Sequence, residues 1–61
     1  MTFELAIKCE NDAFAGSPSE EVARILEALA VKLRAEAPAL NSHGLADLNG
    51  NRVGLADWAG K

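Results

Sequence analysis

The stretch SPSEEVARILEALAVKLRAE, residues 17–36, decides the fold because it predicts one amphipathic helix that needs a second layer to pack on. Ser17 is placed to cap this helix by accepting the amide of Glu20, whose carboxylate can reach back to the Ser17 amide. Pro18 fits the first helical position because its missing N–H would have no partner there. The segment therefore carries a defined helix start.

One face of this helix is apolar. The apolar positions follow the three-and-four spacing of a single stripe and are Val22, Ile25, Leu26, Leu29 and Leu33. On the opposite face, Glu20 and Arg24 have the four-residue spacing of a favourable ion pair. Pro38 disfavours helical dihedral angles in the residue before it, so the helix should end near Glu36.

The segment before the helix predicts a strand. Apolar and other residues alternate over residues 3–9, FELAIKC, which gives the period of two of a strand with one buried face. In this pattern Cys9 points inward and is expected to be buried as a small apolar side chain. A turn follows at Asn11 and Asp12, and Phe14 is expected to be buried beyond it.

The segment after the helix predicts a hairpin. Residues 45–48 and 51–55 flank Asn49-Gly50, a dipeptide that suits a tight two-residue turn. This register places Asp47 opposite Arg52 as an ion pair on the solvent face. The side chains expected to point toward the helix are Ala46, Leu48, Val53 and Leu55.

Together these elements predict an α+β fold with a three-stranded sheet packed by one amphipathic helix, in the order strand, helix, hairpin. The 61 residues suffice for a single small domain, residues 1–61. The second face of the sheet carries a mixture of polar and apolar residues and is therefore expected to stay wet or to pack on another copy. Strand order does not follow from the sequence.

Chain length sets the expected stability. A single core of this size supplies only about 3–5 kcal/mol. Cys9 has no second cysteine to pair with and His43 is the one imidazole, so neither a disulfide nor a histidine-rich metal site supplements the core within one chain. Association, as a homodimer or with another protein, is therefore expected.

The chain is acidic, with a formal net charge of −3 and an isoelectric point near 4.9. Binding to a phosphate backbone depends on Lys and Arg, so nucleic acid is not the expected partner. The first residues, Met1-Thr2-Phe3-Glu4, lack the basic stretch and apolar region typical of a signal peptide, and no apolar run approaches the roughly 18 residues of a membrane span. We therefore expect a soluble, cytoplasmic protein.

The parts of an enzyme active site are missing from the sequence. Cys9 and His43 are the residue types of a nucleophile and a base, but no third residue is indicated to orient them. Residues 47–51 resemble the start of a calcium-binding loop, but Arg52 occupies the position that needs glycine and Trp58 the position that needs glutamate. No metal or nucleotide cofactor is implied, and we predict a protein that is not an enzyme.

Trp58 is the strongest candidate contact residue. A lone tryptophan near the end of a small domain either covers the core or anchors a partner, and the covering role is the favoured one. The remaining surface candidates are charged side chains and one exposed valine. They are Glu20, Glu27, Val31, Asp47 and Arg52.

Three segments, FELAIKCENDAF at residues 3–14, EVARIL at 21–26 and DLNGNRVG at 47–54, resemble small uncharacterised proteins encoded by bacteriophages and prophages. The resemblance spans most of the chain and rests on strand, helix and turn signals that carry no chemistry. It implies an accessory protein that acts inside a bacterial host by occupying the surface of a host protein. Anti-CRISPR and other anti-defence inhibitors are examples of that class.

Two functions thus compete. The leading hypothesis is a non-enzymatic module that binds protein through its open sheet face, a sheet edge or Trp58. The alternative is a small dimeric regulator that binds nucleic acid through a stripe of basic residues. That stripe would consist of Lys8, Arg24, Lys32, Arg34 and Arg52.

Overall fold

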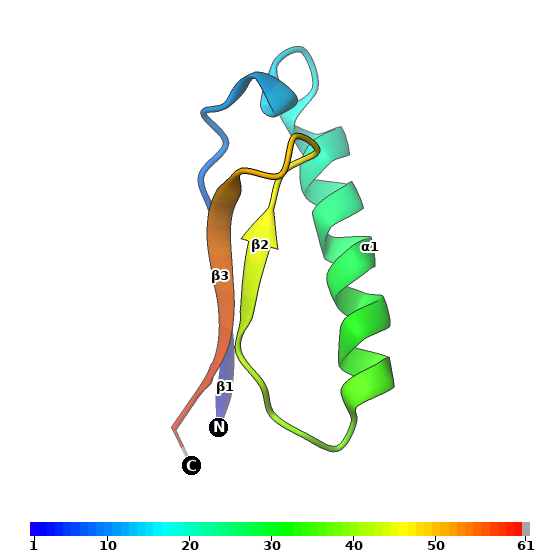
Figure 1. The fold of residues 1–61 in the computed structure, drawn as a ribbon. Helices are drawn as coiled ribbons and strands as arrows, with labels where there is room; N and C mark the ends of the chain where they lie inside the picture. Colours follow the sequence, from blue (N-terminus) through cyan, green and yellow to red (C-terminus); the bar gives the residue numbers. More distant parts are fainter. Residues whose placement is uncertain (61) are drawn as a thin grey trace.

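Residues 1–60, which the computed structural model describes, form a sheet of three strands and one long helix (Figure 1). The strands are β1 (Thr2–Ile7), β2 (His43–Ala46) and β3 (Arg52–Ala59), the helix is α1 (Pro18–Glu36), and a short 3-10 helix, η1, spans Asp12–Phe14. The chain order is strand, helix, hairpin. The α+β fold predicted from the sequence is confirmed.

The longest strand, β3, lies in the middle of the sheet. It pairs antiparallel with β1 on one side and with β2 on the other, in the spatial order β1-β3-β2. Both β1 and β2 are therefore edge strands. The first and the last strand along the chain are therefore neighbours, and Thr2 at the start of β1 stands opposite Ala59 at the end of β3 (Figure 1).

Helix α1 runs along one face of the sheet, nearest to β2, and η1 packs against the helix (Figure 1). It begins at Pro18 and ends at Glu36, as predicted. The predicted capping by Ser17 is wrong, because its side chain makes no capping hydrogen bond. Beyond the helix the Ala37-Pro38 peptide bond is cis. No helix within residues 1–60 is both long and apolar enough to cross a membrane.

The core lies between α1 and the sheet. Ile25 and Leu29 face it from the helix and Phe14 from η1, and all are buried, so the predicted burial of Phe14 is confirmed. The sheet supplies Leu45, Val53 and Ala56. Side chains that are partly buried around this centre are Phe3, Ile7, Ala13, Val22 and Leu33. Leu26, which the stripe placed in the core, is 42% exposed.

Three of the four hairpin side chains predicted to face the helix are exposed instead: Ala46, Leu48 and Leu55. Leu45 is 4% exposed and packs in the core, whereas Leu48 is 69% exposed at the turn. The reason is an irregularity next to the turn, where the β2–β3 register shifts between Leu45 and Ala46. A bulge of this kind changes which residues face inward. Val53 is buried as predicted, but Leu55 lies half exposed on the outer face.

The turn is also longer than the two residues predicted. Asp47 and Asn51 close it through the Asp47 N–H, which donates to the Asn51 carbonyl at 2.9 Å. Gly50 has a φ of +85°, in the left-handed region that glycine tolerates. A glycine in this conformation at the end of a three-residue loop is a common hairpin solution.

Candidate functional site

The outer backbone of β1 is unpaired. The N–H of Lys8 donates to the Val53 carbonyl at 2.8 Å, which continues the β1–β3 register by one pair. In an antiparallel ladder, residues bonded to the neighbouring strand alternate with residues whose N–H and C=O point away from it. The even-numbered residues of β1 therefore bond to β3. The N–H and C=O groups of Phe3, Leu5 and Ile7 point outward, and we call these groups the β1 edge.

The side chains at the β1 edge are apolar. Phe3, Leu5 and Ile7 alternate with outward-facing Glu4 and Ala6, so they lie on the face of the sheet that carries the helix. Helix α1 lies nearest to β2, and Leu5 is consequently left 36% exposed. The β1 edge thus combines unpaired backbone groups with an incompletely covered apolar surface.

Two charged side chains on the other face of β1 lack a partner. Glu4 stands directly opposite Asp57 of β3, so two carboxylates face each other across the strands. Like charges in this position repel. Neither Glu4 nor Lys8 forms an ion pair with any side chain among residues 1–60. Glu4 on the outer face of β1 and Lys8 just beyond the end of the strand therefore carry opposite charges without an ion-pair partner among residues 1–60.

A second polar cluster joins the hairpin turn to the helix. Glu21 and Asp47 are both buried, with 6% and 4% of their surface exposed. The Oδ1 atom of Asp47 accepts the backbone N–H groups of Asn49 and Asn51 at 2.9 and 2.8 Å. The Oδ2 atom accepts the side-chain amide of Asn11 at 2.9 Å. Asp47 thus organises the turn and ties it to the loop before η1.

Glu21 joins α1 to the same turn. Its Oε2 atom accepts the N–H of Leu48 at 2.7 Å, and Arg24 donates to both carboxylate oxygens at 2.9 Å. These hydrogen bonds hold the pKa of Glu21 below its ordinary value, and those from Asn11 and the turn do the same for Asp47. Pairing with Glu21 raises the pKa of Arg24.

These contacts correct two predicted ion pairs. Arg24 pairs with Glu21 three residues before it, not with Glu20 four residues before it. Asp47 is buried in the turn and does not meet Arg52, whose Nε donates to the Gly54 carbonyl at 3.0 Å. The sequence held one overlooked signal: Glu21 lies four residues before Ile25, so it shares the core-facing side of the helix.

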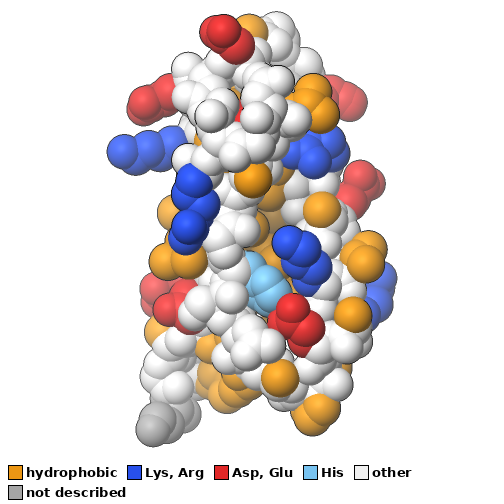
Figure 2. All heavy atoms as spheres, in the orientation of Figure 1, with side chains coloured by type: hydrophobic (Ala, Val, Ile, Leu, Met, Phe, Trp, Pro, Cys, Tyr) orange, Lys and Arg blue, Asp and Glu red, His pale blue; other side chains and the backbone are white. Residues whose placement is uncertain are grey.

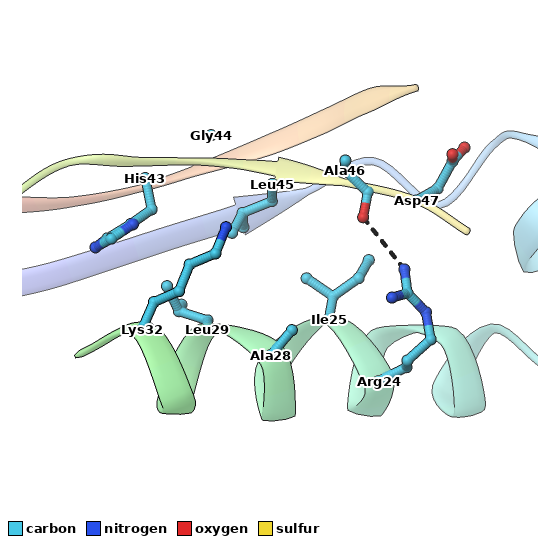
Figure 3. A pocket seen from close by; sticks show the side chains of 10 residues that line it. All are labelled: Arg24, Ile25, Ala28, Leu29, Lys32, His43, Gly44, Leu45, Ala46 and Asp47. Atoms are coloured by element: carbon cyan, nitrogen blue, oxygen red, sulfur yellow. Dashed lines mark hydrogen bonds between the residues drawn. The ribbon is translucent and has the colours of Figure 1, made fainter. Parts of the chain in front are cut away.

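A groove of about 230 Å³ lies between α1 and β2 (Figure 3). Arg24, Ala28 and Lys32 line it from the helix, and β2 supplies His43 and Leu45. The guanidinium of Arg24 reaches across one end and donates to the Ala46 carbonyl at 3.3 Å. In the space-filling view, apolar side chains line this hollow and the pale-blue histidine lies beside it (Figure 2).

His43 precedes the hairpin arm predicted at residues 45–48, yet it is a buried strand residue. It begins β2 and is 8% exposed, with its side chain on the helix side of the sheet. Its Nε2 lies 3.1 Å from Oε1 of Glu36, although the two atoms are not aligned as a hydrogen bond. Strand β2 begins two residues before the predicted hairpin arm at residues 45–48. His43 is therefore part of the sheet, which explains why it is buried.

Cys9 also differs from the prediction. Strand β1 ends at Ile7, so Cys9 does not continue its inward face and is exposed as a free thiol. Its Sγ lies 3.9 Å from the carbonyl oxygen of Ile7, one of the outward-pointing groups of the β1 edge. Cys9 is thus exposed beyond the end of β1, whereas His43 is buried in β2. Within residues 1–60, no three side chains of His, Cys, Asp or Glu are grouped to hold a metal ion.

Trp58 packs on Phe3 where β1 and β3 are paired. The two ring centroids are 4.6 Å apart and the rings are inclined by 51°. Trp58 is half-buried, and its indole Nε1 is buried without a hydrogen-bond partner among the described residues. Phe3 is in turn one of the partly buried side chains packed against the core. A role of Trp58 in partner binding stays a prediction.

The remaining predicted contact residues divide between two places. Glu20, Glu27 and Val31 are all exposed, and their spacing puts them on one face of α1 that points away from the sheet. Arg52 lies on the far face of the sheet, where a side chain added at Gly44 would meet its guanidinium. The structure therefore gathers only the helical residues into one surface.

Comparison with known proteins gives no further guide to the site. No family model matches the chain, and neither a curated protein nor a solved structure matches it.

Proposed function

We propose that this protein acts by binding another protein chain, which adds a strand to the β1 edge. The observation that carries the proposal is the outward direction of the N–H and C=O groups of Phe3, Leu5 and Ile7. An extended strand placed beside β1 would satisfy these groups in the same way as β3 does on the other side. Strand addition of this kind is a common mode of protein recognition.

The sequence of β1 supports the use of its edge for pairing with another chain. Natural edge strands are usually protected by lysine, proline, a bulge or a covering element, because an open edge pairs with other chains. The strand Thr2–Ile7, TFELAI, contains neither lysine nor proline, and its pairing with β3 is regular along its length. Glu4 is its one charged residue, so the edge has little of this protection, which favours a role in pairing.

The basic residues favour protein over nucleic acid as the partner. Arg24 is held by the Glu21 carboxylate, and Arg52 donates to the Gly54 carbonyl. Two members of the predicted basic stripe are therefore engaged within the fold. Because binding to phosphates depends on available Lys and Arg, the nucleic-acid regulator is the weaker candidate.

The biological setting in this proposal follows the resemblance to phage and prophage proteins. The chain would be a non-enzymatic accessory protein in the cytoplasm of a bacterial host, and its partner would be a host protein, such as a defence protein, or another copy of itself. The acidic net charge of −3 suits a basic protein surface.

The test is a proline in the β1 edge. Leu5→Pro removes an N–H that the ladder with β3 does not use, and proline is tolerated on the outer side of edge strands. Leu5→Val retains the N–H and is the matched control. Immobilised wild-type and Leu5→Val protein should capture the same protein partner, either from lysate or as free copies of the chain. Leu5→Pro should not capture it although it remains folded by circular dichroism. Equal capture by all three would contradict the proposal.

A further inference from the structure

We infer that the occupant of the β1 edge is a second copy of this chain, paired antiparallel about a two-fold axis at Leu5. The inference rests on the proposed function, since it names the partner of the same edge. It joins the two three-stranded sheets into one continuous sheet with both helices on the same face. Three observations carry it: the positions of the free backbone groups, the apolar side chains and the charges.

The free backbone groups are self-complementary. A two-fold axis at Leu5 places Leu5 opposite the partner's Leu5, and Phe3 opposite the partner's Ile7. Each of the three outward-pointing residues then exchanges both of its hydrogen bonds with the residue opposite, as hydrogen-bonded pairs of an antiparallel ladder do. The β1 edge is thus fully satisfied by a second β1 edge.

The length of the strand selects this register. A shift of the axis by one residue, to Ala6, would place Phe3 opposite Cys9 of the partner subunit. Cys9 lies beyond the end of β1 and its side chain turns back toward the Ile7 carbonyl. Only the axis at Leu5 pairs all three outward-pointing residues within the strand.

The side chains on the helix-covered face match in this register. Phe3 meets the partner's Ile7, and the half-exposed Leu5 meets its own copy. Aromatic and branched side chains stabilise a sheet when they stand opposite each other. Leu26 lies about 200° around α1 from Arg24, which lines the groove beside β2, so Leu26 lies on the side of the helix toward β1. Pairing therefore covers apolar surface that one chain leaves open.

On the other face, each Glu4 carboxylate gains an opposite charge. In the Leu5-centred register, Glu4 stands opposite the partner's Ala6 and diagonal to both the partner's Lys8 and the partner's Glu4. A lysine side chain spans that separation. The symmetry axis creates the contact between Glu4 and the partner's Lys8 twice and the contact between the two Glu4 carboxylates once, so attraction outweighs repulsion. Each copy thus supplies a cation to the Glu4 carboxylate, which within one chain faces Asp57 and has no ion-pair partner among residues 1–60.

A charge-reversal cycle measured by sedimentation equilibrium tests the inference. Glu4→Lys and Lys8→Glu each turn the two diagonal contacts into repulsions, and each is expected to raise the dimer dissociation constant by roughly fivefold. The double variant restores opposite charges and should return the constant to the wild-type value. Glu20→Lys, on the exposed face of α1, changes the net charge as much as Glu4→Lys does and serves as the control. Reductant is present throughout, to exclude a bridge between exposed Cys9 thiols.

The outcomes separate this inference from the proposed function. A dimer that is weakened by each single reversal and restored by the double variant supports both. A dimer whose dissociation constant is the same in wild type and in all charge-reversal variants overturns the inference, because its interface lies elsewhere. A monomer at all concentrations that still captures another protein in a Leu5-dependent manner overturns the inference and leaves the proposed function standing. A monomer with no Leu5-dependent capture overturns both.

Discussion

The Glu21 carboxylate accepts the backbone N–H of Leu48 at 2.7 Å, across 27 residues of sequence. This hydrogen bond fastens the hairpin turn to the first turns of α1. Asp47 completes the attachment from inside the turn, where it accepts two backbone N–H groups and the Asn11 amide. Two buried carboxylates thus hold the turn in place: Glu21 joins it to α1, and Asp47 joins it to the loop before η1.

Stability should fall in acid because of these two carboxylates. Their ordinary pKa values are 4.5 for Glu21 and 3.8 for Asp47, and both are lowered in the folded protein by the hydrogen bonds they accept. A lowered folded-state pKa gives stabilisation that is complete above the ordinary pKa and is lost as pH falls through the lowered value. Thermal unfolding followed from neutral pH to about pH 2 should therefore show Tm falling once pH drops below these ordinary values.

A neutral double variant isolates this effect. Glu21→Gln with Asp47→Asn should lower Tm at neutral pH and flatten its decline in acid. Glu20→Gln, an exposed neighbour in the same helical turn, is the matched control and should leave the wild-type profile unchanged. An unchanged acid profile in the double variant would contradict the assignment.

The core prediction concerns Leu29, which is 4% exposed. Leu29→Ala should cost about 2–5 kcal/mol through lost burial and a residual cavity. Because a core of this size supplies only about 3–5 kcal/mol, this substitution should remove a large part of the stability of the fold. Leu26→Ala, at a half-exposed site three residues earlier, should cost about 1 kcal/mol or less. Urea titrations of the two variants measure the difference.

The aromatic pair gives a local probe. Phe3→Leu removes the ring that packs on Trp58 and should cost about 0.5–1.5 kcal/mol beyond the lost buried area. Since Trp58 is the one tryptophan, its fluorescence reports this contact without interference. The emission should shift to longer wavelength in Phe3→Leu and stay as in wild type in Leu48→Ala, at the exposed turn. Equal spectra for Phe3→Leu and wild type would mean that the two rings do not pack in solution.

Local patterns predicted the elements well. The start of α1 at Pro18, its end at Glu36 and the burial of Phe14 followed from proline geometry and apolar spacing, although the predicted Ser17 cap did not form. The position of the hairpin followed from Asn49-Gly50. These features depend on neighbours in the chain, which the sequence displays directly.

The directions of the hairpin side chains and the arrangement of the candidate site could not be predicted from the sequence. A bulge beside the turn placed Leu45 and Leu55 on the faces of the sheet opposite to those predicted, and no residue pattern in the sequence indicated this bulge. Asp47 looked like a solvent-facing charge because its partners, Asn11 and the turn amides, meet it only in the fold. The β1 edge depends on strand order, since a sheet with β1 in the centre would have no such edge.

The most direct measurement of the central claim is residue-resolved amide hydrogen exchange of β1 by NMR, in dilute and in concentrated protein. In dilute protein, the amides of Glu4 and Ala6, which bond to β3, should be protected, while the amide of Leu5 exchanges rapidly. In concentrated protein Leu5 should become protected as a second β1 edge pairs with it. If Leu5 exchanges equally fast at every concentration while Ala6 stays protected, β1 is intact but its edge takes no second copy, which would contradict the account.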